Sequence, residues 1–139
     1  MSVKVSIITS MYKGASHIDG FLKNMISQTY FDKCELIIVD GNSPENERET
    51  IDKYMNQHDN ITYHRLEEDP GIYGCWNKGI EISSGEYITN ANLDDKRAND
   101  QIGSFVREMQ KSPEIDLVYS YCFVTNKDHE DFYSNSSNN

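Results

Sequence analysis

The sequence has no long hydrophobic run, few cysteines and no recognisable export signal. No stretch approaches the roughly 18 consecutive apolar residues of a membrane-spanning helix, and residues 1–5 lead directly into strand-like sequence without the apolar region of a signal peptide. The three cysteines, Cys34, Cys75 and Cys122, are scattered and odd in number, which predicts buried free thiols in a reducing compartment. We therefore expect a protein without a transmembrane segment, located in the cytoplasm or at the periphery of a membrane.

Basic residues are also scarce. The 139 residues include 13 Lys and Arg against 23 Asp and Glu, which gives a formal net charge of −10. A chain with so few cations releases few counterions from a phosphate backbone, so we expect no nucleic-acid partner. A small anionic ligand is still compatible with this charge, because a helix N-terminus or a metal ion can hold it.

Several signatures of ligand binding and catalysis are absent as well. The first strand-like segment is not followed by G-x-G-x-x-G, and G-x-x-x-x-G-K-[ST] does not occur, which argues against dinucleotide and P-loop sites. The four histidines are dispersed without zinc spacing, and no G-x-S-x-G marks a serine hydrolase. The functional residues must therefore be of another kind.

What the sequence does contain is an alternation of strand-like and helix-like segments over a length typical of one domain. Such an alternation predicts an α/β fold, with a Rossmann-like, mostly parallel sheet and helices on both faces. We expect the first four strands in the order 3-2-1-4, with a fifth strand added. The predicted strands are 3–9, 36–39, 61–66, 87–89 and 117–124, and the predicted helices are 16–26 (capped by Ser16), 43–55 (opened by Ser43-Pro44), 72–80 (ended by Gly85) and 102–109.

In parallel sheets of this kind, ligands bind outside the carboxyl ends of the strands. Asp40 follows the second strand and Asp94-Asp95 follow the fourth, so they would flank the first strand about 10 Å apart, at about 4.8 Å for each strand step. Paired carboxylates are suitable ligands for Mg²⁺ or Mn²⁺, which leave coordination sites for phosphate oxygens. The alternative is that these aspartates only cap the helices that follow them.

Six segments, in this order, resemble family 2 glycosyltransferases of the GT-A fold. The resemblance covers about residues 3–125 in one register, which makes it more specific than any single motif. It implies an enzyme that binds a nucleoside-diphosphate sugar, most commonly a UDP-sugar, and transfers the sugar with inversion, as in polysaccharide biosynthesis. The six segments are VSIITSMYKG (5–14), SQTY (27–30), ELIIVDGNS (35–43), DPGIYGCWNKGI (69–80), SGEYI (84–88) and NLDD (92–95).

The resemblance also implies a metal site in the NLDD segment, which corresponds to the DxD-type motif of the family. Asp94 would be the ligand of Mn²⁺ or Mg²⁺, with Asp95 as its neighbour. Asn92 stands where the family usually has an acid that contacts the ribose. An amide can still hydrogen-bond a hydroxyl, but it lowers the negative charge near the metal.

The same resemblance assigns the rest of the donor site. Thr9 and Ser10 would line the nucleoside pocket and Asp40 would contact the base. Asn77 and Lys78 match an N-x-G element of the family, with Lys78 as a candidate phosphate partner.

No general base for the transfer reaction is found, since the family places this acid further downstream, beyond residue 139. We therefore expect residues 1–125 to form the nucleotide-sugar-binding domain, without the acceptor-binding half, and residues 126–139 to form a polar, disordered tail. The acceptor is unspecified: a glycan, a lipid or a protein. The alternative to an enzyme is a non-catalytic or truncated module that binds a nucleotide sugar or a partner.

Overall fold

The computed structural model describes residues 2–127, and strands alternate with helices along them. The short, β-branched apolar runs form strands, and the segments with apolar residues three and four positions apart form helices. The elements are β1 (Val5–Met11), α1 (Ile18–Ile26), the short 3₁₀ helix η1 (Phe31–Lys33), β2 (Cys34–Asp40), α2 (Glu47–Met55), β3 (Ile61–Arg65), α3 (Gly71–Ile82), β4 (Tyr87–Asn90) and α4 (Gln101–Lys111).

The four strands form one parallel sheet in the order β3-β2-β1-β4, which confirms the predicted order. In this register Met11, at the end of β1, lies opposite Asp40 of β2, and Asp40 lies opposite Arg65 of β3. β4 ends earlier, with Asn90 opposite Ile8. The segment that follows β4 therefore begins before the carboxyl end of β1 is reached and passes beside the last residues of β1.

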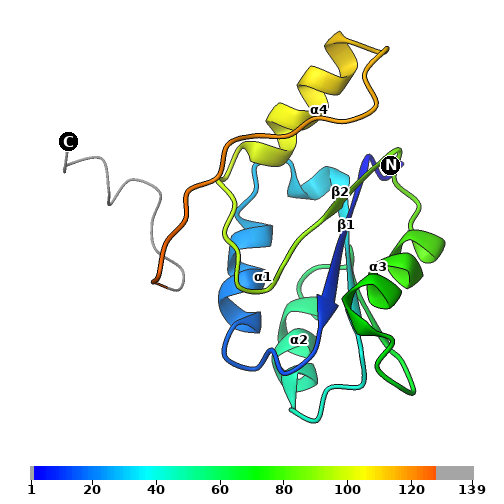
Figure 1. Cartoon of the computed structure of the whole chain (residues 1–139), viewed down its shortest axis with the longest axis vertical. Helices are drawn as coiled ribbons and strands as arrows, with labels where there is room; N and C mark the ends of the chain where they lie inside the picture. Colours follow the sequence, from blue (N-terminus) through cyan, green and yellow to red (C-terminus); the bar gives the residue numbers. More distant parts are fainter. Residues whose placement is uncertain (1, 128–139) are drawn as a thin grey trace.

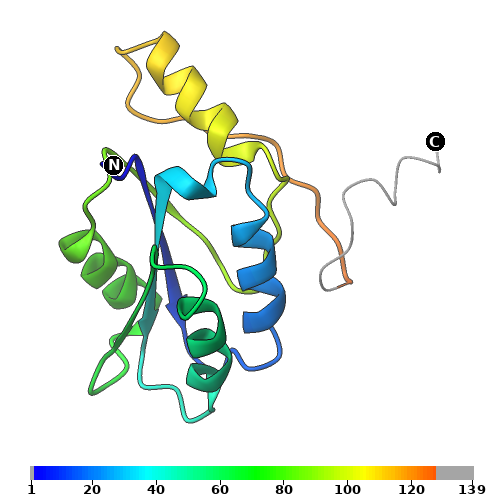
Figure 2. The same cartoon turned by 180° about the vertical axis from the view of Figure 1, so that it is seen from behind.

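Helices cover both faces of the sheet (Figures 1 and 2). α1 and α2 lie on one face, where Phe21, Leu22 and Ile51 are fully buried in the larger hydrophobic core. α3 lies on the other face and closes a smaller core around Ile8 and Cys75. Strands buried on both faces are nearly continuous in apolar residues, which is why β1 and β2 were recognisable from sequence alone.

Gly85 does not end a helix, as the sequence had suggested. α3 ends at Ile82, three residues earlier. A Cβ atom on Gly85 would lie 2.6 Å from the backbone nitrogen of Ser6, so glycine is required here by the close approach of this segment to β1.

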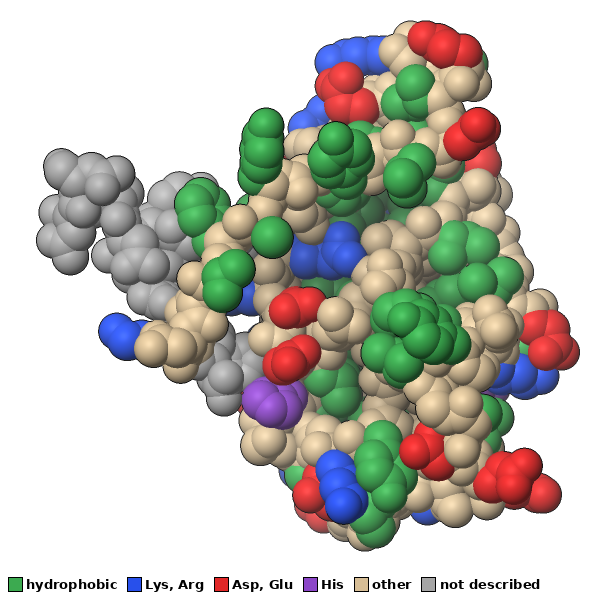
Figure 3. All heavy atoms as spheres, in the orientation of Figure 1, with side chains coloured by type: hydrophobic (Ala, Val, Ile, Leu, Met, Phe, Trp, Pro, Cys, Tyr) green, Lys and Arg blue, Asp and Glu red, His purple; other side chains and the backbone are tan. Residues whose placement is uncertain are grey.

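The fifth strand predicted at 117–124 is not formed. This segment has no ladder partner among the described residues, and it runs back past α4 and away from the sheet (Figures 1 and 2). Its apolar side chains are exposed, Tyr121 by 99% and Phe123 by 84%, and Figure 3 shows hydrophobic side chains in this part of the surface. Alternating apolar residues favour a strand only where a neighbouring strand is available to accept its backbone hydrogen bonds.

The other predictions outside the sheet have mixed outcomes. Cys34 and Cys75 are buried free thiols, and burial raises the pKa of Cys34 to about 12, whereas Cys122 is exposed. Most of the predicted tail, from residue 128 on, lies outside the described residues. Within residues 2–127, no helix is long and apolar enough to cross a bilayer.

Two glycines inside helices provide a test of the packing. A Cβ atom on Gly79 of α3 would lie 2.2 Å from Cγ2 of Ile8, whereas one on Gly103 of α4 would meet its nearest neighbour at an ordinary 3.5 Å. We expect Gly79→Ala to lower the free energy of unfolding by about 1–3 kcal/mol through overpacking. Gly103→Ala should leave it unchanged or raise it by up to about 1 kcal/mol through better helix propensity. Urea denaturation of both variants measures the difference, and equal effects would contradict the close α3–β1 contact.

Candidate functional site

Asp40 lies at the carboxyl end of β2 and is held by three hydrogen bonds. Its side chain is only 1% exposed. Oδ1 accepts from the backbone N–H of Ser43 at 2.7 Å, and Oδ2 accepts from Nη1 of Arg65 at 2.7 Å and from the hydroxyl of Tyr63. The carboxylate is therefore fixed in orientation by the β2–α2 loop and by β3.

Arg65 and Tyr63 were not recognised from the sequence; Arg65 is the last residue of β3 and Tyr63 is its middle residue. Arg65 also donates from Nη2 to Oδ1 of Asn42 at 2.7 Å and to the carbonyl of Ser43 at 2.9 Å, so it ties β3 to the β2–α2 loop. Burial raises the pKa of Tyr63, and its hydrogen bond to Asp40 raises it further, so its hydroxyl remains a donor at neutral pH. Both stand within β3, whereas in parallel sheets of this kind the site is expected at the residues that follow the strands.

A buried glutamate connects the loops that follow β1 and β2. Glu47, the first residue of α2, is 1% exposed and accepts from the N–H of Gly14 and from the hydroxyl of Ser43, both at 2.7 Å. The Ser43 oxygen in turn accepts from the N–H of Lys13 at 2.9 Å. Ser43 therefore links the two loops, and α2 begins at Glu47, three residues later than the first helical position predicted at Pro44.

The four residues expected to contact the nucleoside or its phosphates lie in different surroundings. Thr9 is fully buried and donates to the carbonyl of Ser10 at 3.4 Å, whereas Ser10 is partly exposed near the end of β1. Asn77 is exposed in the middle of α3, about 9 Å along the helix axis from Gly71. Lys78 forms an ion pair of 3.0 Å with Glu81 of the same helix. Only Ser10 of these four is both accessible and close to the strand ends.

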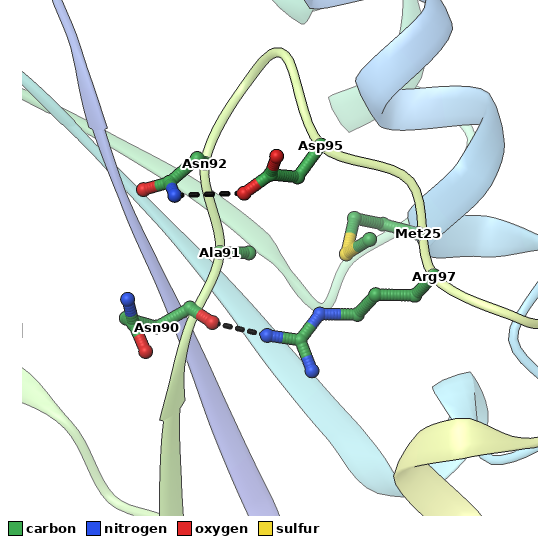
Figure 4. A pocket seen from close by; sticks show the side chains of 6 residues that line it. All are labelled: Met25, Asn90, Ala91, Asn92, Asp95 and Arg97. Carbon is green, nitrogen blue, oxygen red and sulfur yellow. Dashed lines mark hydrogen bonds between the residues drawn. The ribbon is translucent and has the colours of Figure 1, made fainter. Parts of the chain in front are cut away.

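The candidate metal ligands lie in the turn after β4. Asp94 and Asp95 are exposed, and Oδ2 of Asp95 accepts from the side-chain amide of Asn92 at 2.8 Å (Figure 4). A cavity of about 80 Å³ opens beside the turn, lined by Asn90, Asn92, Asp95 and Arg97 among others. The turn thus presents two carboxylates on the side of β1 opposite to Asp40, as predicted from the strand order.

Arg97, which follows this turn, hydrogen-bonds back to the end of β4. Its Nη2 donates to the carbonyl of Asn90, the last residue of β4 (Figure 4). Nη2 also donates to Oγ1 of Thr89 at 3.3 Å, and Nη1 donates to Oε1 of Gln101 at 3.0 Å. Burial lowers the pKa of Arg97, and the nearby carboxylate of Asp95 opposes that shift. The guanidinium therefore holds the two ends of the segment 90–97 together.

The donor atoms of the turn suit a divalent cation that is shared with a phosphate ligand. Within residues 2–127, no three His, Cys, Asp or Glu side chains converge on one point, so the described protein would supply at most the two carboxylates. Mg²⁺ and similar hard cations are commonly held by one or two carboxylates together with substrate phosphates and water. Asp94 and Asp95 fit this pattern, and their exposure leaves room for the phosphates.

Solved structures with a similar fold are glycosyltransferases. TarS of S. aureus in complex with UDP superposes with a TM-score of 0.73 at 21% identity, over 80% of this chain and 33% of that one. The mannosyltransferase PcManGT of Pyrobaculum calidifontis, in complex with GDP-Man and Mn²⁺, superposes with a TM-score of 0.71 at 23% identity, over 78% of this chain and 33% of that one. These likenesses establish the GT-A type of fold that the sequence predicted.

Sequence comparison reaches the same group of proteins. Glycosyltransferase GlyG of Streptococcus pneumoniae is 26% identical over 96% of this chain, which covers 44% of that protein. The cholesterol galactosyltransferase of Borreliella burgdorferi is 26% identical over 87% of this chain, which covers 33% of that protein. The chain thus spans less than half the length of these relatives. The family model described as glycosyl transferase family 2 matches residues 6–137, and the chain therefore belongs to that family.

Proposed function

We propose that this chain binds a nucleoside-diphosphate sugar, a UDP-sugar in particular, at the carboxyl ends of its strands, and that the whole protein transfers the sugar to an acceptor hydroxyl with inversion. The observation that carries the proposal is the pair of exposed carboxylates, Asp94 and Asp95, across β1 from the fixed carboxylate of Asp40. In a member of this family, that arrangement provides one group for the base and another for a cation at the diphosphate.

The similar solved structures support the choice of ligand. TarS is described in complex with UDP and with UDP-GlcNAc, and PcManGT with GDP-Man and Mn²⁺. By this likeness we infer a nucleoside-diphosphate sugar and a divalent cation as the ligands of this chain. A bound divalent cation would supply charge neutralisation to the leaving diphosphate.

The surroundings of the site residues set conditions on their proposed roles. An ionised carboxylate can accept about four hydrogen bonds, and three donors already hold Asp40. Because its side chain is only 1% exposed, an N–H of the base would reach the remaining acceptor position only after the residues that cover it move. Asn92 would bond a ribose hydroxyl with its side-chain oxygen, since its amide nitrogen donates to Asp95. Ser10 would line the nucleoside pocket, with Thr9 supporting it from the core. Asn77 and Lys78 would contact the donor from α3.

The transfer step forms a bond from the acceptor oxygen to the anomeric carbon. The bond from that carbon to the phosphate oxygen breaks, and the nucleoside diphosphate leaves with the electron pair. The hydroxyl proton passes to a general base. Asp94 and Asp95 would contribute, through the cation, only to the departure of the diphosphate. The transfer reaction would therefore need a general base in addition to the donor site.

Calorimetric titration with UDP tests the donor site. We expect UDP to bind in the presence of Mn²⁺ and at least about tenfold more weakly after the metal is removed with EDTA. GDP serves as the control for base preference. Absence of UDP binding under both conditions would contradict the proposal. Assays of UDP-sugar hydrolysis and of transfer to a panel of acceptors then separate an enzyme from a module that only binds.

A further inference from the structure

The SQTY segment at residues 27–30 has no part in the donor site described above. It follows α1 directly, and its residues contact the chain that comes after the Asp94-Asp95 turn. Oγ of Ser27 donates to Oδ1 of Asn99 at 3.1 Å, and the N–H of Thr29 donates to the carbonyl of Asn99 at 2.8 Å. The segment therefore serves as an attachment point for residues 97–102.

Asn24, one turn earlier in α1, makes the most specific of these contacts. Its side-chain nitrogen donates to the carbonyl of Arg97 at 2.8 Å, and its side-chain oxygen accepts from the N–H of Arg97 at 2.8 Å. Asn24 is only 6% exposed. Its amide thus bonds both backbone groups of one residue, as a neighbouring strand would, and fixes the position and direction of the chain at Arg97.

Gln28 repeats this arrangement four residues later. Its side-chain nitrogen donates to the carbonyl of Ala98 at 2.9 Å, and its side-chain oxygen accepts from the N–H of Ile102 at 3.4 Å. Gln28 is 3% exposed. Gln28 lies just beyond the end of α1, and together with Asn24 it bonds backbone groups of Arg97, Ala98 and Ile102. We call these two residues the α1 clamp.

The other end of the turn is held by the sheet. The N–H of Ala91 donates to the carbonyl of Ile8 at 2.8 Å, and Arg97 reaches back to the carbonyl of Asn90. The segment 91–96 is therefore fixed at its start by β1 and at its end by the α1 clamp. Only the turn itself, with its two carboxylates, is left exposed.

We propose that Asn24 and Gln28 are positioning residues for the cation site of Asp94 and Asp95. This inference rests on the proposed function. Groups that orient metal ligands without touching the metal commonly change metal affinity by about 10–100-fold when they are replaced. Two carboxylates on a loosely held turn lose entropy when they bind a cation, whereas on a fixed turn that entropy is already lost in the free protein.

The test compares Asn24→Ala with a matched variant, Asn60→Ala. Asn60 also uses its side-chain amide to bond backbone groups, donating to the carbonyls of Phe31 and Cys34 at 3.0 Å each, and neither carbonyl belongs to the segment 91–102. The measured quantity is the ratio of the Kd for UDP without Mn²⁺ to that with Mn²⁺. We expect the ratio to fall about tenfold in Asn24→Ala and to stay unchanged in Asn60→Ala, with the metal-free Kd unchanged in both. An unchanged ratio in a folded Asn24→Ala protein would overturn the proposal.

Amide hydrogen exchange provides a readout that does not depend on the nucleotide. Exchange at residues 91–99 should become faster in Asn24→Ala and not in Asn60→Ala. Unchanged exchange at these residues would overturn the clamp even if UDP binds, whereas failure of UDP to bind the unmodified chain would contradict the proposed function only. Asn24→Asp keeps the acceptor for the N–H of Arg97 but loses the donor. It replaces Asn24→Ala in both measurements if that variant does not fold.

Discussion

Asp94→Ala is expected to lower the affinity for UDP measured with Mn²⁺ by about 10–100-fold, while the affinity without metal stays the same. The physical reason is that the exposed turn supplies only two carboxylates, and no third ligand from the described residues can replace one of them. Loss of one ligand therefore weakens the hold on the cation, and with it the attraction for the diphosphate.

The design of this experiment separates ligation from general charge. Asp94→Asn keeps the size of the side chain and removes its charge, so it should behave like Asp94→Ala. Asp100→Ala removes a negative charge from an exposed residue further along the same segment, and it should change the affinity less than about twofold because exposed charges are screened by salt. Equal effects of Asp94→Ala and Asp100→Ala on the affinity would mean that the turn attracts the cation only through its overall negative charge and does not ligate it.

Asp40→Ala is expected to lower the free energy of unfolding by about 2–3 kcal/mol. Removal of this buried carboxylate leaves the N–H of Ser43, the hydroxyl of Tyr63 and the guanidinium of Arg65 without their acceptor. Buried groups deprived of a partner cost about 1–3 kcal/mol each. The side chain of Arg65 is 44% exposed and can be hydrated again, which limits the total.

A second aspartate–arginine pair of almost equal length provides the comparison. Asp52 accepts from Nε of Arg48 at 2.6 Å, but both side chains are about half exposed. We expect Asp52→Ala to cost less than about 0.5 kcal/mol, because exposed pairs within a helix contribute little. Urea denaturation of the two variants gives both values. A similar loss in both would show that burial of Asp40 does not determine its contribution.

The sheet could be predicted from sequence because its residues carry a local pattern. The runs around Ile37 and Ile8 are apolar on both faces, which only strands between two helix layers require. The order 3-2-1-4 is the usual one for the first strands of doubly wound sheets, and the structure confirms it. The place of Asp40 and Asp94 on either side of β1 then followed from that order.

The parts that could not be predicted depend on contacts between distant segments. Serine is a residue type that commonly caps helices. The hydroxyl of Ser43 instead accepts from the N–H of Lys13 and donates to the carboxylate of Glu47. Arg65 is an ordinary strand residue until the register sets it opposite Asp40. No spacing in the sequence relates Asn24 to Arg97, since only the fold brings these two residues together.

The segment 117–124 has a consequence for the behaviour of the chain in solution. Its side chains Leu117, Tyr119, Tyr121 and Phe123 are at least 77% exposed, and no strand is paired with it among the described residues. An extended apolar segment with free backbone groups is a template on which another strand can add. In concentrated samples of this chain, self-association would therefore begin at this segment rather than at the acidic surface of the sheet domain.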